Sequence, residues 1–141
     1  MQKSQYADFG KRFVASFVDG IILYILYALA SFVVGLLYAS IFRTAEGVKG
    51  IAFVVAVVIG WLYYALQESS AKQATIGKQA MGIIVTDVDG TRISFSQASV
   101  RHFSKNISLI ILMIGYIMAA FTEKKQALHD LIAGTLVLSS K

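Results

Sequence analysis

Residues 13–42 decide the fold and read FVASFVDGIILYILYALASFVVGLLYASIF. Four polar residues interrupt this otherwise apolar, aromatic and glycine stretch: Ser16, Asp19, Ser31 and Ser40. Thirty helical residues would be roughly 45 Å long, whereas the hydrocarbon core of a bilayer is about 30 Å thick. Counting back from Arg43, the next charge, puts the inner boundary near Leu23. We therefore expect a transmembrane helix over about residues 20–42, with Asp19 at the level of the lipid headgroups.

The composition also points to a membrane protein. The chain has 141 residues, of which 57% are hydrophobic and 15% are charged, which is too apolar for an ordinary soluble domain. The formal net charge of +5 could suit nucleic acid, but the basic residues lie beside the apolar runs, as the positive-inside effect predicts. We therefore expect a lipid bilayer as partner and no nucleic acid.

Two more apolar runs follow the first. The second, over about residues 50–66, ends in aromatic residues that favour the membrane interface, so we expect it to span. The third, residues 107–121, would make roughly 22 Å of helix, which is short for a span. It either crosses with local thinning of the bilayer or enters and returns as two half-helices bent near Gly115. Returning would place the lysines of the tail on the side of the N-terminus, which fits the positive-inside rule better.

The polar segment 67–106 is expected to be cytoplasmic. Residues 82–86 are rich in β-branched side chains, residues 87–90 supply a turn, and residues 91–95 can form the returning strand of a small β-hairpin. A helix from about residue 97 to 106, capped by Ser94 or Ser96, should follow.

The tail covers residues 122–141, and its residues 135–139 have the composition of a short strand. They can join the cytoplasmic hairpin if both lie on one face of the membrane. The predicted fold is a single domain over residues 1–141. It is an all-α membrane protein with two clear transmembrane helices, a short third spanning or re-entrant helix, and a small cytoplasmic β-hairpin.

No motif for catalysis, a metal or a cofactor is present. Gly77-Lys78 lacks the earlier glycine of a phosphate-binding loop, and Gln79 stands where Ser or Thr is required. His102 and His129 have no metal-ligand spacing, and the chain has no cysteine. We therefore predict that the chain is not an enzyme and holds neither a metal nor a cofactor.

One set of charged residues remains. Arg12 and Asp19 are seven residues apart in the first apolar helix, and Asp130 lies in the tail. With them come Gly10, Gly20, Thr75-x-Gly77-Lys78, Gly82, Gly90, Ser94-Phe95, Arg101, Leu128-His129-Asp130 and Ala133-Gly134-Thr135. This pattern resembles the RDD family of small bacterial membrane proteins, named for one arginine and two aspartates. The resemblance covers nearly the whole chain, with two departures: His102 stands where asparagine is usual, and Lys125 where arginine is common.

The resemblance implies a multi-pass protein of the bacterial cytoplasmic (inner) membrane with a cytoplasmic N-terminus. It also implies a charged cluster of Arg12, Asp19 and Asp130. His129, Lys125 and Arg101 are expected to support this cluster.

Two functions follow from this cluster. In one, Arg12 pairs with both aspartates and locks the tail against the first helix, and the protein is a scaffold, assembly or adaptor component. In the other, Asp19 and Asp130 bind monovalent cations or protons in a cation/proton antiporter or other small-solute transporter that acts as an oligomer. A homo-oligomer or a larger membrane assembly is expected in either case.

Overall fold

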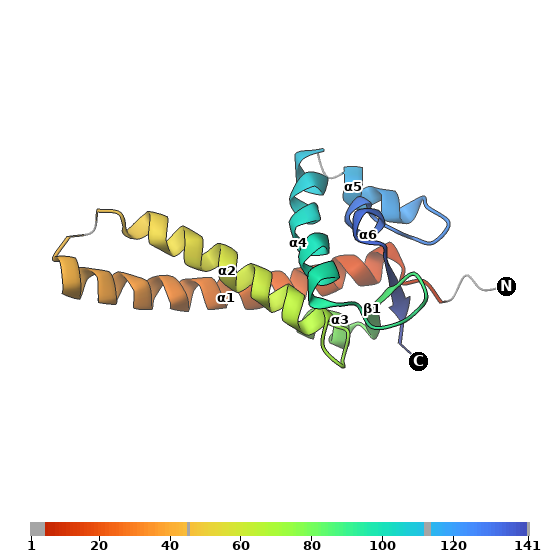
Figure 1. Cartoon of the computed structure of the whole chain (residues 1–141), viewed down its shortest axis with the longest axis horizontal. Coiled ribbons are helices and arrows are strands. Elements are labelled where there is room, and N and C mark those ends of the chain that lie inside the picture. The colour runs from red at the N-terminus through yellow and green to blue at the C-terminus, as the bar shows by residue number, and fades with distance from the viewer. Residues whose placement is uncertain (1–4, 45, 112–113, 141) are drawn as a thin grey trace.

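The computed structural model describes residues 5–44, 46–111 and 114–140. Two long helices, α1 (Phe9–Phe42) and α2 (Val48–Glu68), lie side by side as a hairpin. The hairpin extends from a head formed by the start of α1, the end of α2 and the residues after α2 (Figure 1). Both ends of the described part of the chain lie at the head. The remaining elements are α3 (Ile76–Ala80), β1 (Ile83–Asp87), α4 (Phe95–Ile110), α5 (Ile114–Ile117), the 3₁₀ helix η1 (Met118–Ala120), α6 (Leu128–Ala133) and β2 (Thr135–Ser139).

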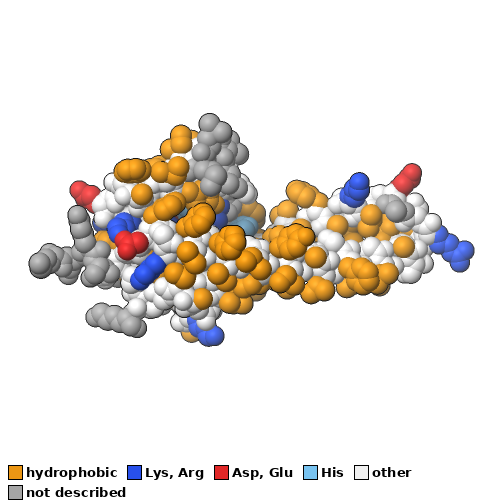
Figure 2. All heavy atoms as spheres, turned by 180° about the vertical axis from the view of Figure 1, so that it is seen from behind, with side chains coloured by type: hydrophobic (Ala, Val, Ile, Leu, Met, Phe, Trp, Pro, Cys, Tyr) orange, Lys and Arg blue, Asp and Glu red, His pale blue; other side chains and the backbone are white. Residues whose placement is uncertain are grey.

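The hairpin has an apolar surface. Phe32 and Ile41 of α1 are 65% and 69% exposed, and Phe53 of α2 is 70% exposed. Figure 2 shows hydrophobic side chains along the hairpin and charged groups at its tip, where α1 and α2 are joined. Both helices are long and apolar enough to cross a membrane. The two predicted apolar helices are therefore confirmed, although α1 begins earlier than the expected span.

The third apolar run does not form one continuous helix. α4 ends at Ile110 and α5 begins at Ile114, and Leu112 and Met113, which belong to the predicted span, lie outside the described residues. A Cβ atom on Gly115 would lie only 2.8 Å from the side chain of Ser108. Residues seven apart in a straight helix are separated by about 10 Å, so the chain has turned back between them. A reversal just before Gly115 agrees with the alternative of two half-helices, and the path of this run through the membrane stays a prediction.

The small sheet differs from the predicted hairpin. β1 is present, but its partner is the C-terminal strand β2, which runs antiparallel to it with Val85 opposite Val137. Residues 91–94 form no strand, because Ser94 and Gln97 make a capping box that starts α4 at Phe95. The residues that were predicted to form the returning strand therefore lead into the start of α4.

α4 presents an apolar face outward. Val100 and Phe103 are 44% and 46% exposed, whereas Arg101, Ser104 and Ser108 on the other face are buried. The sequence predicted the helix and its Ser94 cap correctly, but it did not predict that the polar face would point into the protein. In Figure 1, α4 runs across the hairpin at the head. An outward apolar face at this position suits a helix that lies at the surface of a membrane.

Candidate functional site

Asp130 lies at the centre of the head and is fully buried. It is in the first turn of α6, where its Oδ2 accepts a hydrogen bond of 3.0 Å from the backbone N–H of Ala127. The guanidinium of Arg12, from the first turns of α1, forms an ion pair with the same oxygen. Arg12 also donates a 2.5 Å hydrogen bond to the carbonyl oxygen of Lys125. The first helix and the tail, which are more than one hundred residues apart in sequence, are joined by these contacts.

Arg101 of α4 connects Asp130 to a second carboxylate. Its Nε and Nη2 lie 2.9 and 2.7 Å from Asp130 Oδ1, and its Nη1 lies 2.8 and 2.7 Å from the two oxygens of Glu68. Glu68, the last residue of α2, also pairs with the ammonium of Lys78 in α3. The result is a chain of alternating charges: Arg12, Asp130, Arg101, Glu68 and Lys78. We call these five residues the charge chain.

Burial and charge act in opposite directions on the groups of the charge chain. Burial alone would raise the pKa of Asp130, but the positive charges of Arg101 and Arg12 outweigh it and hold the pKa well below its ordinary value. Burial, together with the charge of Arg101, lowers the pKa of Lys78 to about 8 even though Glu68 is beside it. Asp130 is therefore ionised at neutral pH, as an ion pair with two guanidinium groups requires.

Glu68 and Lys78 were not among the residues predicted for the site. Lys78 belongs to the Thr75-x-Gly77-Lys78 motif that supported the family resemblance, and Glu68 is the acid that ends the second apolar run. A carboxylate at the end of an apolar run and a lysine ten residues later give a signal for an ion pair. This spacing alone does not identify a site residue. The roles of Glu68 and Lys78 become clear only from the structure, in which Arg101 lies between Glu68 and Asp130.

Asp19 lies apart from the charge chain. It is buried, its Oδ1 accepts hydrogen bonds from the Tyr63 hydroxyl at 2.7 Å and the Gly77 N–H at 2.8 Å, and its Oδ2 accepts one from the Thr75 hydroxyl at 2.6 Å. Among the described residues, no cation forms an ion pair with it. The expectation that Arg12 pairs with both aspartates is wrong, since Asp19 instead fixes the start of α3 against α1.

The predicted supporting residues have unequal roles. Lys125 contributes its backbone carbonyl to Arg12, and its ammonium pairs with the exposed carboxylate of Asp8. His129 Nε2 lies 3.5 Å from Asp130 Oδ1, and its Nδ1 lies 3.4 Å from the Ser108 hydroxyl. Burial lowers the pKa of His129 to about 2, so the imidazole is neutral at pH 7 and does not form an ion pair. Arg101, by contrast, is the central cation of the charge chain.

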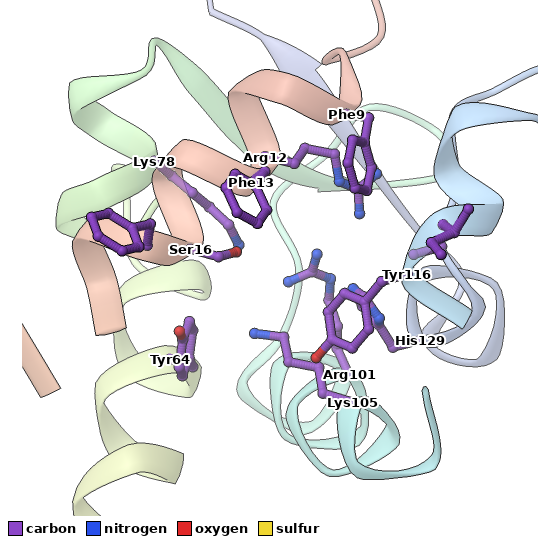
Figure 3. A pocket seen from close by; sticks show the side chains of 13 residues that line it. Phe9, Arg12, Phe13, Ser16, Tyr64, Lys78, Arg101, Lys105, Tyr116 and His129 are labelled. Atoms are coloured by element: carbon purple, nitrogen blue, oxygen red, sulfur yellow. The ribbon is translucent and has the colours of Figure 1, made fainter. Parts of the chain in front are cut away.

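A cavity of about 420 Å³ lies beside the charge chain (Figure 3). Its lining combines basic groups, including Lys105 and Arg101 of α4, with the aromatic rings of Phe13, Tyr64 and Tyr116. Among the residues that the structure describes, no group of His, Asp and Glu side chains is arranged to hold a metal ion.

Comparison with known proteins gave two matches. The model of the RDD family matches residues 6–134. The chain is also similar to "Uncharacterized protein YxaI" of Bacillus subtilis (strain 168), with 40% identity over 146 aligned residues that cover 94% of this chain and 96% of the relative. No solved structure shows a significant match.

Proposed function

The chain belongs to the RDD family of membrane proteins, and from this membership we propose that it is a non-catalytic structural component of the bacterial cytoplasmic membrane. In this proposal α1 and α2 cross the bilayer and the head lies on the cytoplasmic side with the N-terminus. The protein works there as a scaffold, assembly or adaptor subunit, as a homo-oligomer or within a larger membrane assembly.

The charge chain is the observation that carries this proposal. It connects α1, α6, α4, α2 and α3 through groups that are almost completely excluded from water. Removing one partner of a buried ion pair costs about 3–5 kcal/mol, because the other charge remains buried without compensation. Such a network favours one rigid arrangement of the head on the membrane hairpin, which is what a subunit needs if other proteins are to bind it in a fixed orientation.

The transport alternative has less support from the same geometry. A carboxylate that exchanges cations must release its protein partners, yet Asp130 is held by Arg12, Arg101 and the N–H of Ala127. Asp19 is the better candidate for a cation or proton, since it has no described ion-pair partner. Its oxygens nevertheless accept three hydrogen bonds from hydroxyl and amide donors, which satisfy a carboxylate without any bound cation.

Flux measurements in vesicles that contain only this protein test the proposal. We expect no proton-coupled sodium or potassium flux above that of empty vesicles. Flux that is lost in Asp19→Asn and in Asp130→Asn, but kept in Asp89→Asn, would overturn the structural role. Asp89 is a suitable control because it lies exposed in the turn after β1 and is held only by local hydrogen bonds.

A further inference from the structure

The cavity beside the charge chain is basic at its polar side. Arg12, Lys78, Arg101 and Lys105 all line it, from α1, α3 and α4 (Figure 3). None of its lining residues, all of which belong to the described part of the chain, is Asp or Glu. A volume of about 420 Å³ lies within the range of cavities that bind small organic groups. A cavity that is lined by four cationic side chains and no carboxylate favours an anionic ligand.

The positive charge of this cavity is not neutralised by the protein. The carboxylates of Asp130 and Glu68 pair with Arg12, Arg101 and Lys78, which leaves one positive charge in excess. Lys105 adds a second, since it forms no ion pair with a described residue. Its Nζ instead lies 3.5 Å from the centre of the Tyr64 ring, and such a contact compensates a buried ammonium only in part.

The other side of the cavity is apolar and continuous with the membrane hairpin. Phe13 and Phe17 of α1 line it and are 60% and 63% exposed. Beyond Phe17, α1 continues into the apolar stretch that faces lipid, with Ile21, Tyr24 and Ile25 exposed. A ligand that satisfies both sides carries an anionic group at one end and hydrocarbon at the other.

We propose that the cavity binds an anionic phospholipid, with its phosphodiester facing Lys105 and Arg101 and its acyl chains lying along Phe13 and Phe17 of α1. The phosphodiester accepts charge-assisted hydrogen bonds from the ammonium and guanidinium groups, and the exposed phenylalanines supply apolar contact. The net negative charge of the headgroup supplies the selectivity, because the basic cavity repels a headgroup that also carries a cation. The headgroup then occupies the level at which the head of the protein meets the bilayer. The single negative charge of the phosphodiester would offset one of the two positive charges that Asp130 and Glu68 leave unbalanced.

This proposal predicts a pH dependence. Burial lowers the pKa of Lys105 to about 7, an effect that the carboxylate of Glu68 opposes and the charges of Lys78 and Arg101 reinforce. Lys105 faces the cavity with Lys78, whose pKa is about 8, and with the aromatic ring of Tyr64. An anion binds best when these lysines are protonated, so affinity should fall as pH rises from 6 to 8.5. An arginine at position 105 stays protonated over this pH range. Lys105→Arg should therefore remove the part of the decrease in affinity that occurs near pH 7.

Native mass spectrometry of the detergent-purified protein tests the site. We expect phosphatidylglycerol to bind at least about tenfold more tightly than phosphatidylcholine with the same acyl chains. Lys105→Gln should lower the affinity for phosphatidylglycerol about tenfold and lower that for phosphatidylcholine much less, because the choline cation offsets the charge of its phosphate. Lys124→Gln is the matched control, because Lys124 is exposed and does not line the cavity, and it should bind like the natural chain.

A second variant keeps the test decisive if Lys105→Gln fails to fold. Ser16→Trp places a large ring at the exposed lining of the cavity and should abolish the preference for phosphatidylglycerol. Equal binding of the two lipids, or a preference that survives both variants, would overturn the proposal. Competition by glycerol 3-phosphate tests whether a soluble phosphate compound, rather than a lipid, is the ligand of the cavity. If it displaced the lipid at equal concentration, the acyl chains would contribute nothing, and the assignment to a phospholipid would be wrong.

Discussion

Arg101 joins two buried carboxylates, one from the middle of the chain and one from its C-terminal part. Its planar guanidinium donates from Nε and Nη2 to Asp130 and from Nη1 to Glu68, a geometry that a single ammonium cannot reproduce. Burial would lower the pKa of Arg101, but the charges of Glu68 and Asp130 raise it above its ordinary value. The arginine therefore remains charged under all ordinary conditions, and the charge chain has no titrating group at its centre.

Arg101→Gln should destabilise the head strongly. The change leaves Asp130 with Arg12 and Glu68 with Lys78, but it removes the buried guanidinium that binds both carboxylates and links them. We expect a loss of about 3–5 kcal/mol, measured as a lower midpoint of thermal unfolding in detergent. Arg92→Gln is the control, since Arg92 is exposed and forms no described ion pair, and its midpoint should be unchanged. Equal midpoints for the two variants would show that the charge chain does not stabilise the head.

His129 should make stability depend on pH. Its pKa is about 2 in the folded protein, because burial opposes protonation, and about 6.5 in an unfolded chain. The unfolded state therefore binds more protons between these values, so stability should fall as pH decreases below about 6.5, by about 1 kcal/mol for each pH unit. His129→Gln should remove the share of this slope that His129 contributes, as seen from unfolding midpoints at pH 7.5 and pH 5.5.

His102 contributes to the same slope. Burial, reinforced by the nearby charge of Lys105, lowers its pKa to about 4, so it also resists protonation in the folded state. Because both folded-state pKa values lie below 5.5, His102→Gln should reduce the slope between pH 7.5 and pH 5.5 about as much as His129→Gln does. An unchanged slope in the His129 variant would contradict the burial of a neutral imidazole beside Asp130.

At the scale of residues, the sequence led to Arg12 and Asp130 through the family resemblance, but it grouped Asp19 with them. Seven residues of helix separate Arg12 and Asp19 by about 10 Å along α1, so one guanidinium cannot pair with Asp19 and also extend to the tail. That limit was already visible in the spacing. The partners that Asp19 has instead, Tyr63 and Thr75, come from distant segments, so no local pattern reveals them.

At the scale of elements, α3 packs closely against α1 at Gly77. A Cβ on Gly77 would lie 2.8 Å from the carboxylate of Asp19 and would also clash with the backbone carbonyl oxygen of Ala15. Backbone atoms cannot move aside as the end of a flexible side chain can. Gly77 is therefore required by the approach of two helices, and this gives the Thr75-x-Gly77-Lys78 motif a structural meaning.

Gly77→Ala should separate α3 from α1 and break the hydrogen bond from the Gly77 N–H to Asp19. We expect a loss of about 1–3 kcal/mol in thermal unfolding, as for other overpacked sites. Gly10→Ala is the matched control in α1, since nothing lies within 4 Å of its Cβ position, and it should be neutral or slightly stabilising. If both variants unfolded at the same temperature, α3 would not be held as described.

The elements themselves were more predictable than their pairing. The apolar runs gave α1 and α2, and the β-branched residues gave both strands, because these signals are local. The pairing of β1 with β2 depends on where the chain goes after α4, which no local pattern determines. The sequence also predicted a strand at residues 91–95, where the capping box of Ser94 and Gln97 begins a helix.

For the whole molecule, the central claim is that the tail returns to the side of the N-terminus. The antiparallel pairing of β1 with β2 and the ion pair of Arg12 with Asp130 both require it. The charge distribution of the sequence favoured this path over a full third crossing, and the reversal between Ser108 and Gly115 follows it. The hairpin tip near Thr44 lies at the far end of the hairpin from the head, so in the proposed placement we expect it on the opposite side of the membrane.

Cysteine labelling across the membrane tests this claim most directly, because the chain has no cysteine of its own. Single variants Asp89→Cys, Ser140→Cys and Thr44→Cys would be treated with an impermeant thiol reagent in sealed, oriented vesicles. We predict that positions 89 and 140 are labelled from one side and position 44 from the other. Labelling of positions 89 and 140 from opposite sides would contradict the pairing of β1 with β2, the charge chain and the structural role proposed from it.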